Sequence, residues 1–396
     1  MGGNPALLQL LDQLLAEKGK IPFAQYMDLA VNHPEHGYYA KARPIIGPGG
    51  DFVTAPSFHP VFGRTLWRQV KEMLELIGLG EPVRILEIGA GGGHMARDIL
   101  LAARKEGRGE ALRYLILEQS ARLREEQRRL VQEAWPEAPV EWVPSLAAAE
   151  PVHVVLMNEL MSAFPVHRLV MDGEGNWQEL YVTRTPAGLD YTPGPVSDPD
   201  AVQVLVDRGI VPAPGQIMDV NLGAPAFLAE ITRVLTPKAF VLTIDYGGPA
   251  HVVYDPARPR GCTLRCYYRQ QPLDSPFFMP GYQDITADLD FDLLIQRGKR
   301  LGLAAVGLLP QGPFLVNLGI EDTARKLARR ARSGDLAADM ELQKVYTLYA
   351  PEGIGESFWV LVQCRGFDPV PALQGFAQAE PPALTFMELL NPNRTD

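Results

Sequence analysis

The chain has 396 residues, with 37 Lys and Arg against 47 Asp and Glu, so its formal net charge is −10 at pH 7. This charge disfavours a protein that binds nucleic acids or anionic membranes mainly by electrostatics, because most of its surface would repel those partners. Hydrophobic residues make up 46% of the chain and charged residues 21%, which is the composition of a globular protein and not of a disordered one.

The first 80 residues predict helices separated by a long loop. Five leucines recur at helical spacing between Pro5 and Gly19, which predicts an amphipathic first helix. Residues 21–65 are rich in aromatics, Gly and Pro, so we expect a short helix and then a loop with turns at residues 47–50. The pattern of residues 61–78 is again helical.

From residue 83 onward, short apolar runs alternate with helical segments. Such runs are typical of parallel strands buried on both faces, so we predict an α/β fold with a doubly wound sheet and right-handed crossovers. The expected strands are residues 83–88, 112–117, 140–143, 152–157 and 240–244, and the expected helices end near residue 105 and span 120–133.

The remaining segments are less regular. Residues 166–171 and 177–183 resemble a strand pair, and residues 227–235 trace a helix face that Thr236 and Pro237 close. Residues 249–290 are expected to be irregular, and residues 321–347 to form one polar helix. Residues 304–309 and 358–363 would finish the sheet as an antiparallel pair, and the Pro-rich tail from residue 368 would be surface-bound or loose.

The turn after the first predicted strand contains Gly89, Gly91 and Gly93 and lies at the strand's carboxyl end, where ligands of such folds bind. Dinucleotide sites require a third glycine at the position of His94, whereas the acidic-x-Gly-x-Gly-x-Gly order beginning at Glu87 is typical of S-adenosylmethionine sites. The alternatives are a tight strand-to-helix turn without ligand and an NAD(P)-dependent oxidoreductase.

Glu118 follows the second strand, where its carboxylate could accept both ribose hydroxyls. An acid at Glu87 suits the cationic part of this cofactor better than it suits a pyrophosphate. We assign the following residues to cofactor binding: Thr54, Glu87, Gly89, Ala90, Gly91, Gly93, Glu118, Gln119, Ser145, Leu146 and Asn158.

Three polar residues follow later strands and are the catalytic candidates. Asn158 and Glu159 could orient an amine, guanidinium or hydroxyl for attack on the methyl group. Asp245 could act as a base or bind an amine. For Asn158 and Asp245 the alternative is a helix or turn cap, a role that these residue types fill well.

The chain resembles the MidA / NDUFAF7 (DUF185) family of class I S-adenosylmethionine-dependent methyltransferases over roughly residues 5–365. Ala90 and Gly92 stand where the family often has Pro and Arg. The resemblance rests on motifs in the same order, which are Ile21-Pro22-Phe23, Gly37-Tyr38-Tyr39, Gly50 through Pro56, Glu87 through Gly93, Asn158-Glu159, Ile244 through Gly247, Thr263-Leu264-Arg265, Asp284 through Ala287 and Asn317-Leu318-Gly319.

The resemblance implies a helical N-terminal extension with a cofactor-covering loop (1–80) and a methyltransferase domain (81–365). It also implies substrate-cleft insertions near 166–215 and 249–300, followed by a tail (366–396). Eukaryotic members act in mitochondria as assembly factors that methylate an arginine of a respiratory complex I subunit. In this chain Ser57, Ser162 and Asp288 stand where the family usually has Glu, Asp and His. Because paired carboxylates hold a guanidinium best, the two serines predict a weaker clamp and a different acceptor.

We therefore expect a methyltransferase that acts on a protein or peptide side chain, and we allow for a homodimer. The competing hypothesis is a non-catalytic assembly factor that binds the cofactor and clasps a partner protein. Cys262, Cys266 and Cys364 are too few for a disulfide framework and lack the neighbours of a zinc site, so no metal is expected. Without a signal-peptide pattern or a long apolar run, we expect a cytoplasmic location and no membrane or nucleic-acid partner.

Overall fold

The computed structural model describes residues 2–40, 54–78, 82–258, 263–378 and 384–390. These residues form two compact units, each assembled from separate stretches of the chain. The first unit comprises Met1–Phe52, Leu160–Leu228 and Tyr246–Arg297, and the second comprises Val53–Glu159, Ala229–Asp245 and Gly298–Asp396. The linear boundaries that we expected from the sequence remain a prediction.

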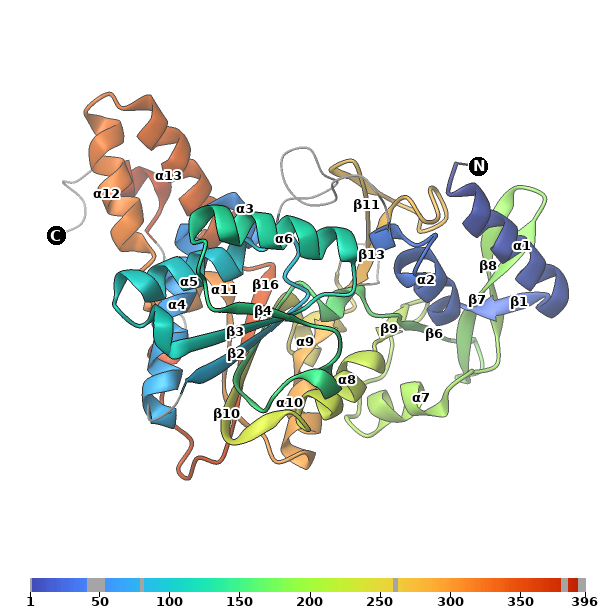
Figure 1. Ribbon diagram of the computed structural model, residues 1–396. Helices are drawn as coiled ribbons and strands as arrows, with labels where there is room; N and C mark the ends of the chain where they lie inside the picture. The colour runs from blue at the N-terminus through green and yellow to red at the C-terminus, as the bar shows by residue number, and fades with distance from the viewer. Residues whose placement is uncertain (1, 41–53, 79–81, 259–262, 379–383, 391–396) are drawn as a thin grey trace. The chain divides into compact units, whose positions relative to one another are not determined.

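The second unit is built on one large sheet, which confirms the expected α/β class (Figure 1). Its strands β4, β3, β2, β5 and β10 are parallel, and at the far end β15 and β16 form the antiparallel pair that the sequence predicts. In sheet order the strands are β15 (Ala304–Pro310), β16 (Phe358–Arg365), β10 (Leu235–Gly248), β5 (Val152–Asn158), β2 (Val83–Ile88), β3 (Leu112–Leu117) and β4 (Val140–Val143).

Three helices lie side by side along the parallel strands of this sheet, with α4 packed on α5 and α5 on α6 (Figure 1). Their apolar sides are buried, and Ser120 begins α6 by accepting a hydrogen bond from the Leu123 N–H. The helices of the unit are α3 (Ala55–Phe58), α4 (Val61–Ile77), α5 (His94–Lys105), α6 (Ala121–Ala134), α11 (Gln311–Asn317), α12 (Glu321–Arg332), α13 (Leu336–Tyr349) and α14 (Phe386–Leu390).

The first unit contains two smaller sheets and a separate apolar core. One sheet has the order β1, β7, β6, β9, with β8 on β7, and the other has the order β12, β11, β13. Helices α1 and α2 bury Leu7, Leu11 and Tyr26 in this core. The elements are α1 (Pro5–Lys18), β1 (Lys20–Pro22), α2 (Phe23–Asn32), β6 (His167–Met171), β7 (Trp177–Thr185), β8 (Gly188–Gly194), α7 (Pro199–Val206), β9 (Met218–Val220), α9 (Ala250–Val253), β11 (Leu264–Tyr268), β12 (Gln271–Leu273), β13 (Asp284–Ala287) and β14 (Leu289–Asp290). Helices α8 (Gly223–Ile231) and α10 (Phe291–Arg300) continue past the boundary between the units.

Three local expectations differ from the structure. Residues 249–290 contain strands β11 to β14 instead of an irregular segment. The polar segment 321–347 forms two helices, because Gly334 adopts a φ of +92° and Asp335 caps a new helix with its side chain. Helix α8 ends at Ile231, and Leu235 already belongs to strand β10.

Some predictions concern residues that the structure does not describe. The expected turns at residues 47–50 and most of the cofactor-covering loop lie outside the described residues. Part of the tail is described and is held against helix α4 of the same unit, since the Gly375 N–H donates to Gln69 Oε1 at 3.0 Å. Among the described residues, none of the helices is both long enough and apolar enough to cross a bilayer.

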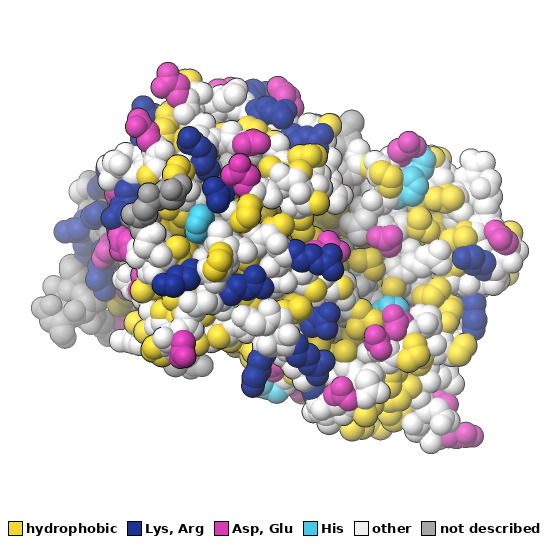
Figure 2. All heavy atoms as spheres, turned by 60° about the horizontal axis from the view of Figure 1, so that its bottom comes forward, with side chains coloured by type: hydrophobic (Ala, Val, Ile, Leu, Met, Phe, Trp, Pro, Cys, Tyr) yellow, Lys and Arg dark blue, Asp and Glu magenta, His cyan; other side chains and the backbone are white. Residues whose placement is uncertain are grey.

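Acidic and basic side chains are mixed with apolar ones over the face shown in Figure 2, so the net charge of −10 does not form a single acidic surface there.

Candidate functional site

The turn between β2 and α5 has a backbone shape that glycine adopts readily. Gly89, Gly91 and Gly93 have φ angles of +70°, +52° and +82°, in the left-handed region that side chains with a Cβ avoid. The Gly89 N–H donates to the Leu117 carbonyl at 2.9 Å, and the Gly93 N–H donates to the Ala90 carbonyl at 2.8 Å. The turn is thus fixed to strand β3 and presents its backbone at the carboxyl end of β2.

Glu87 precedes this turn and is buried, with 2% of its surface exposed. Burial raises its pKa to about 7; the hydrogen bond from Tyr114 opposes this rise, and the nearby charge of Glu118 adds to it. The Tyr114 Oη–H donates to Glu87 Oε2 at 2.7 Å, and burial raises the pKa of that tyrosine well above its ordinary value. Glu87 therefore exchanges its proton near neutral pH, and its charge depends on what lies beside it.

Glu118 follows the last residue of β3, and both of its carboxylate oxygens accept hydrogen bonds from neighbouring residues. Oε1 accepts from the Ser120 N–H at 2.9 Å, and Oε2 accepts from Gln127 Nε2 at 3.3 Å. A carboxylate has about four acceptor positions, so both oxygens can still accept hydroxyl donors. Burial raises the pKa of Glu118, and hydrogen bonds from Ser120 and Gln127 oppose this rise. Gln119 is exposed, and its carbonyl accepts from Arg124 at 3.0 Å.

Ser145 and Leu146 lie just beyond the carboxyl end of β4. Ser145 is exposed and precedes a 3₁₀ helix, Leu146–Ala148, while Leu146 is half-buried. Both residues therefore lie beyond the same edge of the sheet as Glu87 and Glu118, because β4, β3 and β2 are parallel.

Asn158 and Glu159 lie at the carboxyl end of β5. Glu159 has a φ of +55°, an unusual conformation for a residue with a side chain, and its N–H donates to the Ile244 carbonyl at 2.9 Å. Glu159 Oε1 accepts from Asn158 Nδ2 at 3.1 Å and from the Ala55 N–H at 3.3 Å. Asn158 Oδ1 is buried and has no hydrogen-bond partner among the described residues. Asp245 is fully buried. It follows Ile244 on the neighbouring strand β10, and because Ile244 is in register with Asn158, Asp245 occupies the position on β10 that Glu159 occupies after β5.

Thr54 and Ser57 form a capping box at the start of the short helix α3. The Thr54 N–H donates to Ser57 Oγ at 3.0 Å, and Ser57 Oγ–H donates to the Thr54 carbonyl at 2.8 Å. This holds the Ala55 N–H toward Glu159. Ser57 therefore has a local structural role at a position where the resembled family usually has an acid.

The five parallel strands bring the predicted residues that follow them to one edge of one sheet, and the hydrogen bond from the Ala55 N–H to Glu159 links the segment beginning at Thr54 to the same edge. The donors and acceptors there suit S-adenosylmethionine: a glycine turn that admits a ligand close to its backbone, a carboxylate that can accept two hydroxyls, a second acid for a cationic group, and the orphaned Asn158 Oδ1 as an acceptor for an amino group. The side chains of this set are acids and an amide oxygen acceptor, none of which is suited to bind a phosphate.

Sequence reasoning missed three residues that support these acids, namely Tyr114, Gln127 and Trp142. Tyr114 carried a signal, because it is a polar residue in an apolar strand and alternates with Ile116, the register partner of Glu87. The sequence around Gln127 and Trp142 gives no such signal, because their hydrogen bonds join α6, β4 and the glycine turn, which are distant along the chain.

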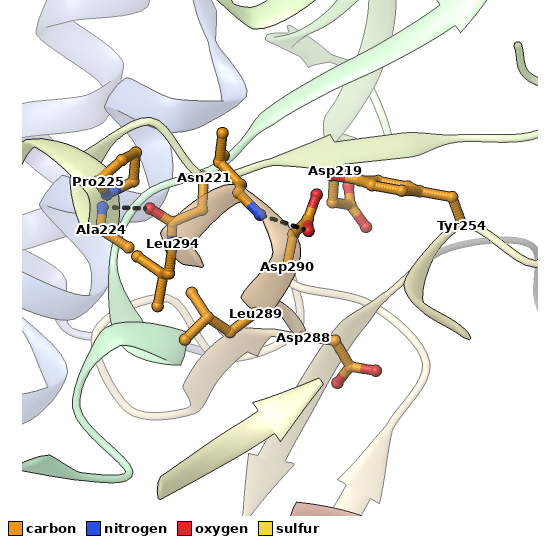
Figure 3. Close-up of a pocket in the computed structure, with 10 residues that line it drawn as sticks. Asp219, Asn221, Ala224, Pro225, Tyr254, Asp288, Leu289, Asp290 and Leu294 are labelled. Carbon is orange, nitrogen blue, oxygen red and sulfur yellow. Dashed lines mark hydrogen bonds between the residues drawn. The ribbon is translucent and has the colours of Figure 1, made fainter. Parts of the chain in front are cut away.

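The first unit contains a different polar pocket, shown in Figure 3. Its carboxylates are bound within the unit: Asp219 accepts from Arg168 Nε at 2.8 Å, and Asp290 lies 2.6 Å from Arg208 Nη2. Asp290 Oδ1 also accepts the Leu293 N–H at 3.1 Å. Asn221 Oδ1 accepts the Ala224 N–H at 2.9 Å, as the dashed line between them in Figure 3 shows. The carboxylates that line this pocket are therefore paired with arginines of the same unit.

Comparisons with known proteins agree with the chemistry of the glycine-turn site. The profile of the S-adenosyl-L-methionine-dependent methyltransferase family matches residues 65–309. The mouse protein arginine methyltransferase NDUFAF7, mitochondrial, is 27% identical over 381 residues, which cover 89% of this chain and 83% of that protein. Its human counterpart is 24% identical, with coverage of 90% and 83%.

A solved structure from Burkholderia thailandensis, bound to S-adenosyl-homocysteine, superimposes with a TM-score of 0.85. It is 32% identical to this chain, and the match covers 96% of each chain.

These relatives overturn the cytoplasmic location that we expected, because the curated relatives from mouse, rat and fly are named as mitochondrial proteins. The expectation rested on the few cysteines and the N-terminal residues. Neither feature distinguishes the cytoplasm from other compartments in which thiols stay reduced, so the prediction is wrong.

Proposed function

Because this chain belongs to the family of S-adenosyl-L-methionine-dependent methyltransferases, we propose that it methylates a side chain of a protein or peptide. The relatives named protein arginine methyltransferase support a protein acceptor. The observation that carries the proposal is the placement of two carboxylates and a left-handed glycine turn at the ends of adjacent parallel strands.

In this proposal the cofactor-binding residues are those of the glycine-turn edge. The backbone of Gly89, Ala90, Gly91 and Gly93 lies against the ligand, and Glu118 accepts its ribose hydroxyls. Glu87 and Asn158 Oδ1 bind its cationic end, while Thr54, Gln119, Ser145 and Leu146 line the remaining edge. When bound, S-adenosylmethionine supplies a methyl group on a sulfonium, which is already electrophilic. The protein must therefore align the acceptor and, for a nitrogen acceptor, accept a proton.

We propose that Glu159 orients the acceptor and that Asp245 provides a second carboxylate at the neighbouring strand end. The left-handed backbone at Glu159 supports this role, because strained conformations of this kind are concentrated at functional sites. The Ala55 N–H and Asn158 Nδ2 both donate to Oε1, so the carboxylate is held in one orientation.

This chain lacks two of the carboxylates with which the family it resembles would bind an arginine side chain. Ser57 replaces an acid and is part of a helix cap, and Ser162 replaces another. The acid gained at Asp288 does not compensate, because Arg265 Nε donates to it at 2.8 Å and Arg258 also donates to it. We therefore infer that arginine is a weaker acceptor here than another side chain of the substrate protein.

The experiment is transfer of labelled methyl groups from S-adenosylmethionine to matched peptides that differ only in one central residue. We expect label in a peptide other than the arginine peptide, and loss of transfer in Glu159→Gln. Glutamine keeps the acceptor for the Ala55 N–H and removes only the charge, so this variant should still bind S-adenosylhomocysteine. A wild-type chain that binds S-adenosylhomocysteine but labels no peptide and no protein would favour the non-catalytic partner-binding hypothesis.

A second variant tests the acceptor inference. Ser57→Glu restores the acid and suits the third position of the capping box, and Ser57→Gln is the matched uncharged control. We expect faster labelling of the arginine peptide by Ser57→Glu than by Ser57→Gln. Equal rates for the two variants would show that position 57 does not select the acceptor.

A further inference from the structure

Gln127 lies on α6, is fully buried, and connects three elements of the second unit. Its Nε2 donates to the Gly91 carbonyl at 2.8 Å and to Glu118 Oε2 at 3.3 Å. Its Oε1 accepts from Trp142 Nε1 on strand β4 at 2.8 Å. One amide thus contacts the glycine turn, the acid after β3 and the next strand.

The orientation of this amide is determined by its partners. The indole N–H of Trp142 can only donate, so it must face the amide oxygen. The amide NH₂ group then faces two acceptors, the Gly91 carbonyl and the Glu118 carboxylate. A flipped amide would place oxygen against oxygen at both positions, so only one orientation satisfies all three groups.

Gly93 allows α6 to approach the turn closely enough for these bonds. A Cβ at position 93 would lie 3.1–3.3 Å from the Cγ, Cα and Cβ atoms of Gln127, a tighter approach than most Cβ atoms make. Two features therefore favour glycine at position 93: its φ of +82°, and the close approach of Gln127, which leaves little space for a side chain.

We propose that Gln127 is a positioning residue that couples the glycine turn to Glu118 and thereby sets the affinity for the cofactor. This inference rests on the cofactor site proposed above. With one NH₂ group bound to both parts, the Gly91 carbonyl and the Glu118 carboxylate keep a fixed separation. The cofactor then meets a preorganised pair of contacts and does not have to order them itself.

The test is calorimetric titration of the full chain with S-adenosylhomocysteine. Gln127→Met removes all three hydrogen bonds at similar volume, and Gln127→Glu keeps the shape and the Trp142 bond but replaces the donor with a carboxylate. We expect Gln127→Met to weaken binding about 10- to 100-fold, the effect of leaving buried acceptors unpaired. Thermal melting of both variants without ligand shows whether each is folded.

Acidification distinguishes positioning from packing. At pH 8 a carboxylate at position 127 faces Glu118, with Glu87 nearby, while Arg124 is the basic group that lowers the pKa of Glu118. At pH 6 the new carboxyl can take up a proton and donate again. We expect Gln127→Glu to bind S-adenosylhomocysteine more tightly at pH 6 than at pH 8, and the wild type to show no such gain. A side chain at position 127 that did not contact the Glu118 carboxylate would not produce this difference.

A double-mutant cycle with Glu118→Ala completes the test. If Gln127 acts through Glu118, the fold-loss caused by Gln127→Met is smaller when Glu118 is already absent. Equal losses in both backgrounds, or Gln127 variants that bind as tightly as the wild type, overturn the inference alone. A wild-type chain that does not bind S-adenosylhomocysteine overturns the proposed site together with it. Should Gln127→Met fail to fold, Gln127→Glu at pH 8 replaces it in the cycle, and wild-type affinity of that variant at pH 8 would overturn the inference.

Discussion

The buried acid of the glycine-turn site predicts a measurable pH dependence of stability. The pKa of Glu87 is raised from 4.5 to about 7 in the folded chain, because burial penalises its charged form. The unfolded chain releases this proton near pH 4.5, whereas the folded chain keeps it until about pH 7. The stabilising effect of the proton is therefore fully present below pH 4.5 and is lost as the pH rises through 7.

The magnitude follows from the size of the shift. A rise from 4.5 to about 7, at 1.36 kcal/mol per pKa unit, corresponds to about 3.4 kcal/mol. Integrated between pH 5 and pH 8, the linkage relation gives a decrease of about 2.5 kcal/mol in the free energy of unfolding. Other groups also titrate in this range, so the prediction concerns the difference between the wild type and Glu87→Gln. Glutamine keeps an acceptor for the Tyr114 hydroxyl and cannot ionise.

The measurement is chemical denaturation of both proteins at pH 5 and pH 8 without cofactor. We expect the wild type to lose about 2.5 kcal/mol more than Glu87→Gln over this interval. If both proteins lose the same free energy, Glu87 does not carry a raised pKa. If the wild type becomes more stable than the variant as the pH rises, the sign of the shift is wrong as well.

Two further predictions concern other residues of the two units. Gly91→Val should abolish binding of S-adenosylhomocysteine, because φ is +52° at this position and a β-branched side chain would also fill the space against the ligand; an unchanged dissociation constant would remove the turn from the site. Asp288→Asn should lower the free energy of unfolding by about 3 kcal/mol, because Arg258 and Arg265 would lose the charge that they share. If chemical denaturation gives this variant the same free energy of unfolding as the wild type, the two guanidinium groups do not need the charge of Asp288.

The parallel sheet and its glycine turn could be predicted because their signals are local. Apolar runs such as 152–157 predict strands buried on both faces, and three closely spaced glycines predict a turn whose backbone has room for a ligand. The acids at positions 87 and 118 follow from the same pattern, because parallel strands place their carboxyl ends at one edge. The sequence thus predicts the edge and its polar residues before any tertiary contact is known.

The strands within residues 249–290 could not be predicted in the same way. Strand β11 pairs with β13 through residues as far as 23 positions apart, Leu264 and Ala287, and the intervening chain includes a further strand, β12. Short strands paired at this distance depend on tertiary packing more than on propensity. The break at residue 334 is a different case, because glycine followed by Asp335 is a local stop-and-start signal that the amphipathic pattern of 321–347 obscured.

The electrostatics of the site select among ligands that the glycine pattern alone admits. Glu87 is already destabilised as an anion by burial and by the charge of Glu118, so a ligand that brings further negative charge would raise its pKa beyond about 7. A pyrophosphate would do this at a cost in binding. A ligand with an ammonium and a sulfonium has the opposite effect, since each cation near Glu87 favours the carboxylate and lowers its pKa. In the proposed site, the buried acid that destabilises the ligand-free protein above pH 7 therefore favours a cationic cofactor and disfavours a dinucleotide.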